Sequence, residues 1–147
     1  MAETAETTAA REAWKSILAL VGWGGNRPPR FPSVAEALGL SPKQLGVIFR
    51  IEPGDAVPMR RIAQQLYCDA SYVTDLVDKL EERNLIVRGS DPADRRVKLL
   101  ALTDEGEELR ESALGLLYEP PEELMALSEV ERRKLSELLA KALASSE

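Results

Sequence analysis

The feature that most restricts the fold of this chain is a change of hydrophobic period within residues 58–102. Pro58 precedes one apolar stripe at helical spacing, and Asp69 or Ser71 is placed to cap a second helix. The two stripes consist of Met59, Ile62, Ala63 and Leu66, and of Val73, Leu76, Val77 and Leu80. Only three or four residues around Tyr67-Cys68-Asp69 separate them, which is the spacing of a helix-turn-helix.

Beyond the second helix, the apolar residues form two short β-prone runs over residues 85–88 and 97–102. Between them, residues 89–96 are rich in turn-forming residues and end in Arg95-Arg96. Two strands around a charged loop, attached to a helix-turn-helix, describe a winged helix. We therefore expect a mainly α fold with a small β-hairpin wing (α+β), in which a winged helix-turn-helix is flanked by N- and C-terminal helices.

Helix signals continue on both sides of this core. Apolar spacing predicts a first helix over residues 11–21 and two further helices after Thr103 and after Ser128. Three pairs of residues have the spacing of a capping box: Ser33 and Glu36, Ser41 and Gln44, and Ser128 and Glu131. The apolar stripes of the last two helices exceed what one small winged helix can cover, which leaves either an intramolecular bundle or a dimer.

The charge of the chain is unevenly distributed. Its 147 residues suit a single domain, and they include 19 Lys and Arg against 25 Asp and Glu. Residues 99–147 hold 5 basic and 12 acidic side chains, whereas residues 83–98 hold 5 basic and 2 acidic ones. The net charge of −6 therefore does not exclude a nucleic-acid partner, because one short segment is locally basic.

Residue types exclude several classes of function. No apolar run reaches the roughly 18 residues of a membrane span, so no membrane partner is expected. The single cysteine, Cys68, rules out an internal disulfide and favours a reducing, cytoplasmic compartment. Without His and with only one Cys, neither a zinc site nor a Ser-His or Cys-His centre can be assembled, so we expect no enzyme and no cofactor.

The order of elements and several motifs together resemble the multiple-antibiotic-resistance-regulator (MarR) family of bacterial transcription factors. The motifs are Leu40-Ser41-Pro42-Lys43-Gln44, Ile62-Ala63-Gln64-Gln65-Leu66, the run from Asp69 to Glu81, Asp91-Pro92-Ala93-Asp94-Arg95-Arg96 and Leu100-Ala101-Leu102-Thr103-Asp104-Glu105-Gly106. The resemblance implies a homodimer that binds duplex DNA at a palindromic operator, most often as a repressor, and that a small organic ligand often releases. It also implies one domain over residues 1–147, with the DNA-binding core at 40–106 and helical dimerisation regions at 11–39 and 107–147.

The second helix of the helix-turn-helix carries the first group of candidate DNA contacts. On a helical wheel Ser71 and Asp75 point away from the apolar stripe, with Thr74 on one shoulder and Tyr72 and Lys79 on the other. The N-terminal part of such a helix enters the major groove, where Asp75 can accept a hydrogen bond from a cytosine amino group. The alternative is an ordinary solvated helix face, since several acids lie on it.

The wing carries the second group. We expect Arg95 to enter the minor groove and Arg96 to organise the loop by pairing with Asp91 or Asp94. Arg88 and Lys98, like Lys79 on the helix, are candidate phosphate contacts. The alternative is a turn that local ion pairs stabilise, without any role in binding.

Two further sets of residues carry weaker expectations. Trp14, Trp23, Arg27 and Arg30 are candidates for binding a small aromatic or acidic ligand, although Trp is more often plain core or interface. Cys68 falls in the turn, where a lone thiol either senses oxidants or is a small packed hydrophobe. The rival functions are therefore a redox sensor acting through Cys68 and a winged-helix protein-interaction module without DNA contact.

Overall fold

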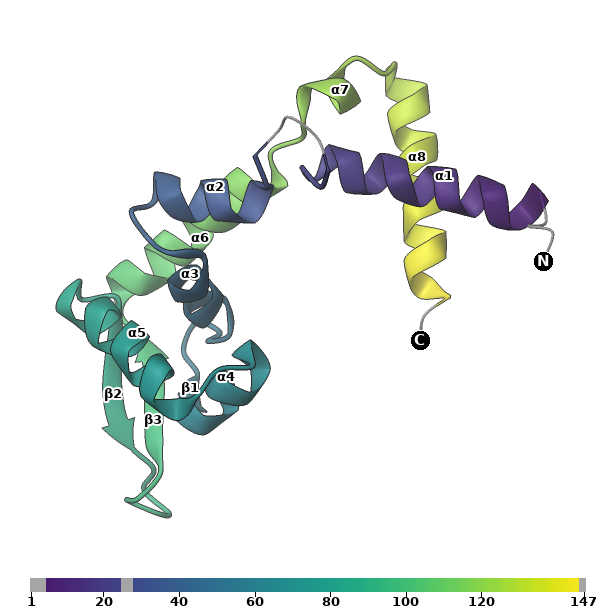
Figure 1. Ribbon diagram of the computed structural model, residues 1–147. Helices are drawn as coiled ribbons and strands as arrows, with labels where there is room; N and C mark the ends of the chain where they lie inside the picture. The colour runs from purple at the N-terminus through teal and green to yellow at the C-terminus, as the bar shows by residue number, and fades with distance from the viewer. Residues whose placement is uncertain (1–4, 25–27, 146–147) are drawn as a thin grey trace. The chain divides into compact units, whose positions relative to one another are not determined.

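The computed structural model describes residues 5–24 and 28–145, and the chain divides into two compact units. The central unit is formed by residues 27–117, and the terminal unit by residues 1–26 together with 118–147. The elements follow the order α1, α2, α3, β1, α4, α5, β2, β3, α6, α7, α8 (Figure 1). The mainly α fold with a small antiparallel sheet confirms the fold class expected from the sequence.

The helix-turn-helix consists of α4 (Met59–Leu66) and α5 (Ala70–Glu82). Tyr67 ends α4 in the left-handed conformation, with φ of 52°, and this allows the backbone to turn within three residues. Asp69 occupies the N-cap position of α5, but its side chain makes no capping hydrogen bond. Asn84, with φ of 57°, provides the corresponding left-handed turn just after α5.

Three strands form the wing sheet, in the order β1-β3-β2 and with antiparallel pairing throughout. The hairpin strands β2 (Ile86–Ser90) and β3 (Lys98–Leu102) were expected from the sequence. The third strand, β1 (Ala56–Pro58), was not expected, and it pairs Ala56 with Ala101 and Pro58 with Leu99. Its three residues are too few to show an alternating pattern, so only its partner on β3 defines it as a strand.

Of the capping boxes expected before α3 and α2, the structure contains only the first. The capping box of α3 (Pro42–Phe49) is confirmed, because Ser41 accepts from the Gln44 amide and Gln44 accepts from the Ser41 amide. The capping box expected at Ser33 is wrong. The helix α2 (Arg30–Ala37) already begins after Pro29, so Ser33 lies inside it and donates its hydroxyl to the Pro29 carbonyl.

A single apolar core lies inside the central unit. Its fully buried members include Leu45, Ile48, Ile62, Leu80 and Leu100, which come from α3, α4, α5 and β3. Burial of each such side chain contributes roughly 1.5–3 kcal/mol, so this core fixes α5 and the wing in one arrangement. The helix α6 (Asp104–Tyr118) packs onto the core through Ala113 and the partly buried Leu109 and Leu117.

The terminal unit contains α1 (Ala5–Leu20), the short α7 (Glu122–Met125) and α8 (Glu129–Ala144). The capping box at Ser128 and Glu131, expected from the sequence, begins α8. No apolar side chain described in these three helices is buried. The helices that the structure describes include none that is long and apolar enough to cross a membrane.

Candidate DNA-binding interface

The helix α5 separates its apolar and polar residues cleanly. Val73, Leu76, Val77 and Leu80 are buried in the core, whereas Ser71, Asp75 and Lys79 are exposed on other faces of the helix. Tyr72 is 46% exposed. Thr74 is half-buried and donates its hydroxyl to the Ala70 carbonyl at 2.9 Å, so one of the expected contacts is already engaged within the helix.

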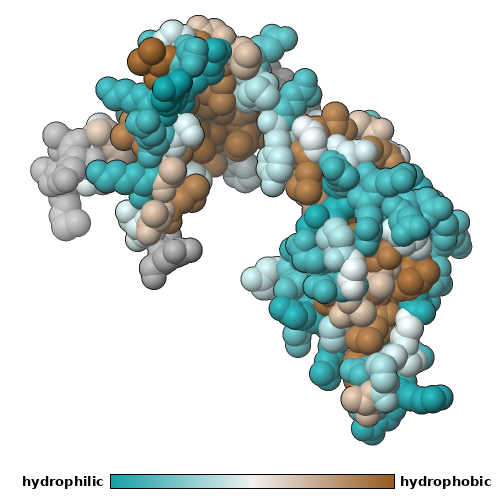
Figure 2. Space-filling model, turned by 180° about the vertical axis from the view of Figure 1, so that it is seen from behind, coloured by the Kyte–Doolittle hydropathy of each residue, from teal (hydrophilic) through white to brown (hydrophobic). Residues whose placement is uncertain are grey.

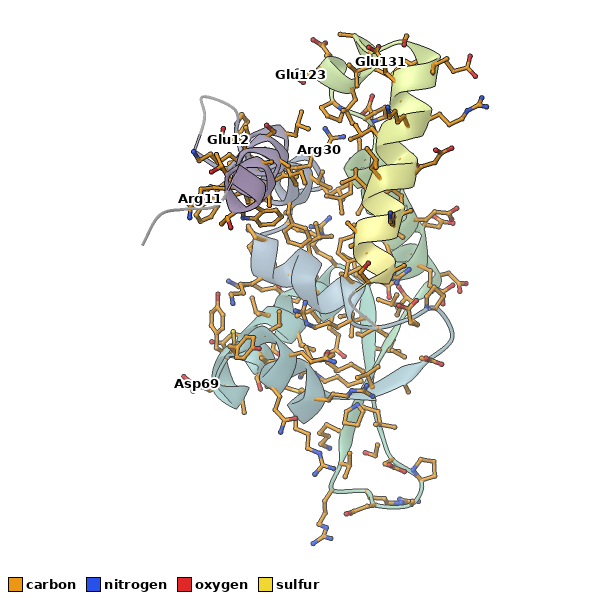
Figure 3. All side chains as sticks on the ribbon, turned by 90° about the vertical axis from the view of Figure 1, so that its right-hand side faces the viewer. Arg11, Glu12, Arg30, Asp69, Glu123 and Glu131 are labelled. Atoms are coloured by element: carbon orange, nitrogen blue, oxygen red, sulfur yellow. The ribbon has the colours of Figure 1, made fainter. Side chains whose placement is uncertain are left out.

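The N-terminus of α5 is open to solvent. Figure 3 shows Asp69 at the start of this helix with its side chain directed away from the packed helices. Tyr67, in the turn before it, is 96% exposed. An exposed helix N-terminus with free backbone N–H groups is suited to contact the phosphates that flank a groove.

The wing loop is built from two local turns that its aspartates stabilise. The Asp91 carboxylate accepts from the Ala93 amide at 2.8 Å, and the Asp94 carboxylate accepts from the Arg96 amide at 3.1 Å. Arg96 also donates through Nε and a terminal nitrogen to the two oxygens of Asp94, at 3.0 and 3.1 Å. This hydrogen bonding lowers the pKa of the Asp94 carboxyl and raises that of Arg96. Asp91, Asp94 and Arg96 therefore shape the loop.

Arg95 lies between these turns but has a different environment. It is exposed, and it makes no ion pair with any other residue that the structure describes. The loop extends beyond the helices at the tip of the β2–β3 hairpin (Figure 1). The Arg95 guanidinium is therefore available to an external anion, whereas the Arg96 guanidinium is held by Asp94.

A basic hollow lies between the wing and the helix-turn-helix. Its volume is about 270 Å³, and its lining includes Arg60 from α4, Arg96 from the wing loop and Lys98 from β3. Arg60 was not among the DNA contacts expected from the sequence, all of which lie on α5 and the wing. The adjacent pair Arg60-Arg61 at the start of the first helix was the available signal, because that helix crosses the DNA backbone in a helix-turn-helix complex.

Arg88 does not point freely into solvent as a phosphate contact would. It forms ion pairs with Asp78 and Glu81 of α5 and donates to the Thr74 carbonyl at 3.4 Å. Arg88 lies on β2, so these contacts fasten the wing to α5. The structure therefore places this candidate as a link between two elements.

The candidate ligand residues are distributed over both units. Trp14 and Trp23 belong to the terminal unit and are 57% and 73% exposed. Arg30 belongs to the central unit, where it donates to the Leu116 carbonyl at 2.8 Å and so joins α2 to α6. Arg27 lies outside the described residues. Ligand binding by this set stays a prediction.

Cys68 lies in the turn between α4 and α5, as expected. Its side chain is half-buried beside the core, and the thiol donates to the Leu66 carbonyl at 3.2 Å. These contacts are typical of a small packed residue. A redox role of Cys68 stays a prediction.

Comparison with known proteins identifies relatives of the helix-turn-helix and the wing. The sequence model of the MarR family matches residues 40–98, from just before α3 to the first residue of β3. The HTH-type transcriptional repressor MdtR of Bacillus subtilis (strain 168) is 37% identical over 79 residues, which cover 54% of this chain and 51% of MdtR. The chain thus spans about half the length of the curated relatives it matches at this level.

Solved structures resemble the chain over nearly its whole length. The YusO protein of Bacillus subtilis has a TM-score of 0.68 and 27% identity, over 99% of this chain and 100% of that one. A MepR variant of S. aureus bound to an oligodeoxyribonucleotide has a TM-score of 0.65 over the same shares, and its 24% identity makes it a match of fold. Sequence and fold agree in placing the motifs of residues 40–106 in a winged helix-turn-helix, and residues 40–98 of the chain match the MarR family.

Proposed function

We propose that this chain is a sequence-specific transcriptional regulator that binds duplex DNA as a homodimer at a palindromic operator. One observation carries the proposal: the exposed polar face of α5 lies beside a wing whose cations are exposed. Arg95 is free of ion pairs among the described residues, and Arg60 and Lys98 line the basic hollow next to α5. Such an arrangement places a helix in the major groove and cations along the backbone.

Each group then has a distinct part in binding. Ser71, Tyr72 and Asp75 reach base edges or nearby phosphates from the N-terminal half of α5. Arg95 enters the adjacent minor groove, where the negative potential favours a guanidinium. Arg60, Lys79 and Lys98 contact phosphates, while Arg96 and Arg88 hold the wing loop and the wing itself in position.

The terminal unit supports a homodimer. The exposed apolar residues of α7 and α8 include Met125, Leu138 and Leu143. Figure 2 shows hydrophobic residues gathered on the surface of the lobe that carries the chain ends. An exposed apolar surface of this kind marks an interaction site. A second copy is the occupant we propose, because a two-fold operator requires two recognition helices about 34–36 Å apart.

Repression and release by a ligand belong to the same proposal. The relative MdtR is named a transcriptional repressor, and curated relatives of this kind are named as regulators rather than enzymes. A CouR structure from Rhodococcus jostii RHA1, 25% identical to this chain, is described as bound to p-coumaroyl-CoA. We propose that a small aromatic or acidic ligand lowers the DNA affinity of this chain by changing the spacing of the two α5 helices. Such a regulator works where the genome is, in the cytoplasm.

The test is fluorescence anisotropy of the full chain on the DNA upstream of its own gene and on a scrambled duplex, over a salt series. Nanomolar affinity for the upstream DNA, much weaker binding to the scrambled duplex and a steep loss with salt are expected. Arg95→Ala should weaken specific binding roughly tenfold or more while the dimer persists. Arg133→Ala is the matched control, because it removes the same charge from α8.

Two results would count against this function. Equal and weak binding to both duplexes, repeated with duplexes selected from a random library, would leave the winged-helix protein-interaction module as the better reading. An affinity of Arg95→Ala that equals the affinity of Arg133→Ala would remove the wing from the DNA interface.

A further inference from the structure

The acidic residues of α5 differ in how they are neutralised. The helix carries Asp75, Asp78, Glu81 and Glu82 against a single cation, Lys79. Arg88 from β2 pairs with both Asp78 and Glu81, so two of the four carboxylates are engaged within the chain. A helix proposed to enter a DNA groove therefore keeps uncompensated negative charge.

Asp75 is the first unpaired carboxylate within α5 itself, since Asp69 precedes the helix at its N-cap. It is exposed, and within the part of the chain that the structure describes it makes no ion pair and no side-chain hydrogen bond. It follows Ser71 by four residues, so both lie on the outward face, opposite the buried Val77 and Leu80. This face is the one available to base edges.

A free carboxylate is costly at such a place. Duplex DNA carries one negative charge per about 1.7 Å of its axis, so an acid in the groove is repelled unless it gains a specific hydrogen bond. Only amino groups of bases can donate to it in the major groove, namely N4 of cytosine and N6 of adenine. Adenine presents its N7 acceptor next to N6, which repels a second carboxylate oxygen, whereas cytosine has no acceptor at the corresponding edge position.

We propose that Asp75 determines specificity at one base pair of each half-site by accepting a hydrogen bond from the N4 amino group of cytosine. This inference rests on the proposed DNA-binding function. It assigns to the operator a C·G pair that faces α5. Within α5 itself, the other unengaged polar groups of the N-terminal half, including the Ser71 hydroxyl, can serve any base or a phosphate, so Asp75 is the group that restricts the choice.

The experiment selects preferred duplexes from a random library with the full-length wild-type chain and with Asp75→Asn. We expect one position in each half-site to change from C·G to A·T, because a carboxamide both accepts and donates and so matches N7 and N6 of adenine. On the wild-type site, Asp75→Ala, which has no acceptor for cytosine N4, should bind about tenfold more weakly. Glu82→Gln is the matched control, since it removes the same charge from an exposed position at the far end of α5.

The sign of the effect separates specific recognition from simple repulsion. If Asp75 only repels phosphates, Asp75→Asn and Glu82→Gln will both tighten binding to every duplex, and the selected sequences will not change; that result overturns the inference. Asp75→Ala completes a double-mutant cycle between the residue and the base pair. Replacement of the C·G pair by T·A should lower the DNA affinity of the wild type about tenfold and leave the affinity of Asp75→Ala almost unchanged. A wild-type chain that selects no sequence at all overturns the proposed function itself, and this failure shows before any variant is compared.

Discussion

At the scale of single residues, Gly106 has no room for a side chain. It is the third residue of α6, and a Cβ atom at this position would lie 2.0 Å from the Leu85 carbonyl oxygen. The Leu85 oxygen is held in place because it accepts from the Thr103 amide at 3.1 Å. We therefore expect Gly106→Ala to lower the free energy of unfolding by about 3 kcal/mol, measured by urea denaturation.

The same helix offers the control for this prediction. Gly115 is exposed, and a Cβ atom there would meet no atom within 4 Å. Gly115→Ala should raise the free energy of unfolding by up to about 1 kcal/mol, because Ala is the better helix former. Equal losses in both variants would show that the close approach to Leu85 is not what requires glycine at position 106.

Residue by residue, the sequence predicts local bonds better than distant ones. The capping boxes at Ser41 and Ser128 could be predicted because each joins groups three residues apart. The pairing of Arg96 with one of two nearby aspartates could be predicted for the same reason. The contact of Gly106 with Leu85 could not, because it depends on how α6 packs against the start of the wing.

Among the elements, the contact between β2 and α5 decides the role of Arg88. The sequence suggested a phosphate contact, whereas the side chain bridges from the wing to Asp78 and Glu81. We expect Arg88→Ala to weaken DNA binding by loosening the wing, while the slope of log affinity against log salt stays unchanged. Anisotropy titrations over a salt series measure both quantities.

Lys98 is the comparison for this prediction. It is exposed on β3 next to the basic hollow, and if it contacts a phosphate, Lys98→Ala should reduce the salt slope by about 0.9. The double variant Arg88→Ala/Asp78→Ala should show the same free energy of unfolding as Arg88→Ala alone, because Arg88→Ala already removes the ion pair between Arg88 and Asp78. A reduced salt slope in Arg88→Ala would return this residue to the DNA contacts.

Element by element, the hairpin and the helix-turn-helix could be predicted because each shows its own hydrophobic period over several residues. The strand β1 and the helix α7 could not, because three or four residues carry too little pattern. The start of α2 was misplaced for a different reason. A Ser-Glu pair at capping distance occurs by chance, and the Pro28-Pro29 boundary before Arg30 was the better signal.

At the scale of the whole molecule, the chain buries its apolar residues unevenly. Every fully buried apolar side chain that the structure describes lies between Val34 and Ala113, in the central unit. The terminal unit instead exposes a groove of about 450 Å³ on α7 and α8, whose lining includes Leu124, Leu135 and Leu139. The sequence left open whether these helices form an intramolecular bundle or a dimer, and this exposed groove is the surface that the proposed dimer would cover.

Leu138→Glu tests this assignment within the full chain. Leu138 is 56% exposed on α8, so a carboxylate there costs a single chain little but would be desolvated in an interface between copies. We expect sedimentation velocity to show a monomer at concentrations where the wild type is a dimer. The control is Lys134→Glu, which introduces the same carboxylate at an exposed polar position of α8.

Loss of the dimer should leave binding to a single half-site intact and weaken binding to a duplex with two half-sites. The central unit holds its own core, so Leu138→Glu should keep the circular dichroism and the weak affinity of a single half-site. Its affinity for a two-half-site duplex should fall to nearly that value, because a monomer gains nothing from the second half-site. Deletion of the residues after Glu119 should have the same effect. If the Leu138→Glu variant and the deletion variant both remain dimeric, the copies associate through other surfaces. If a monomeric variant still binds the two-half-site duplex tightly, dimerisation is not required for operator recognition.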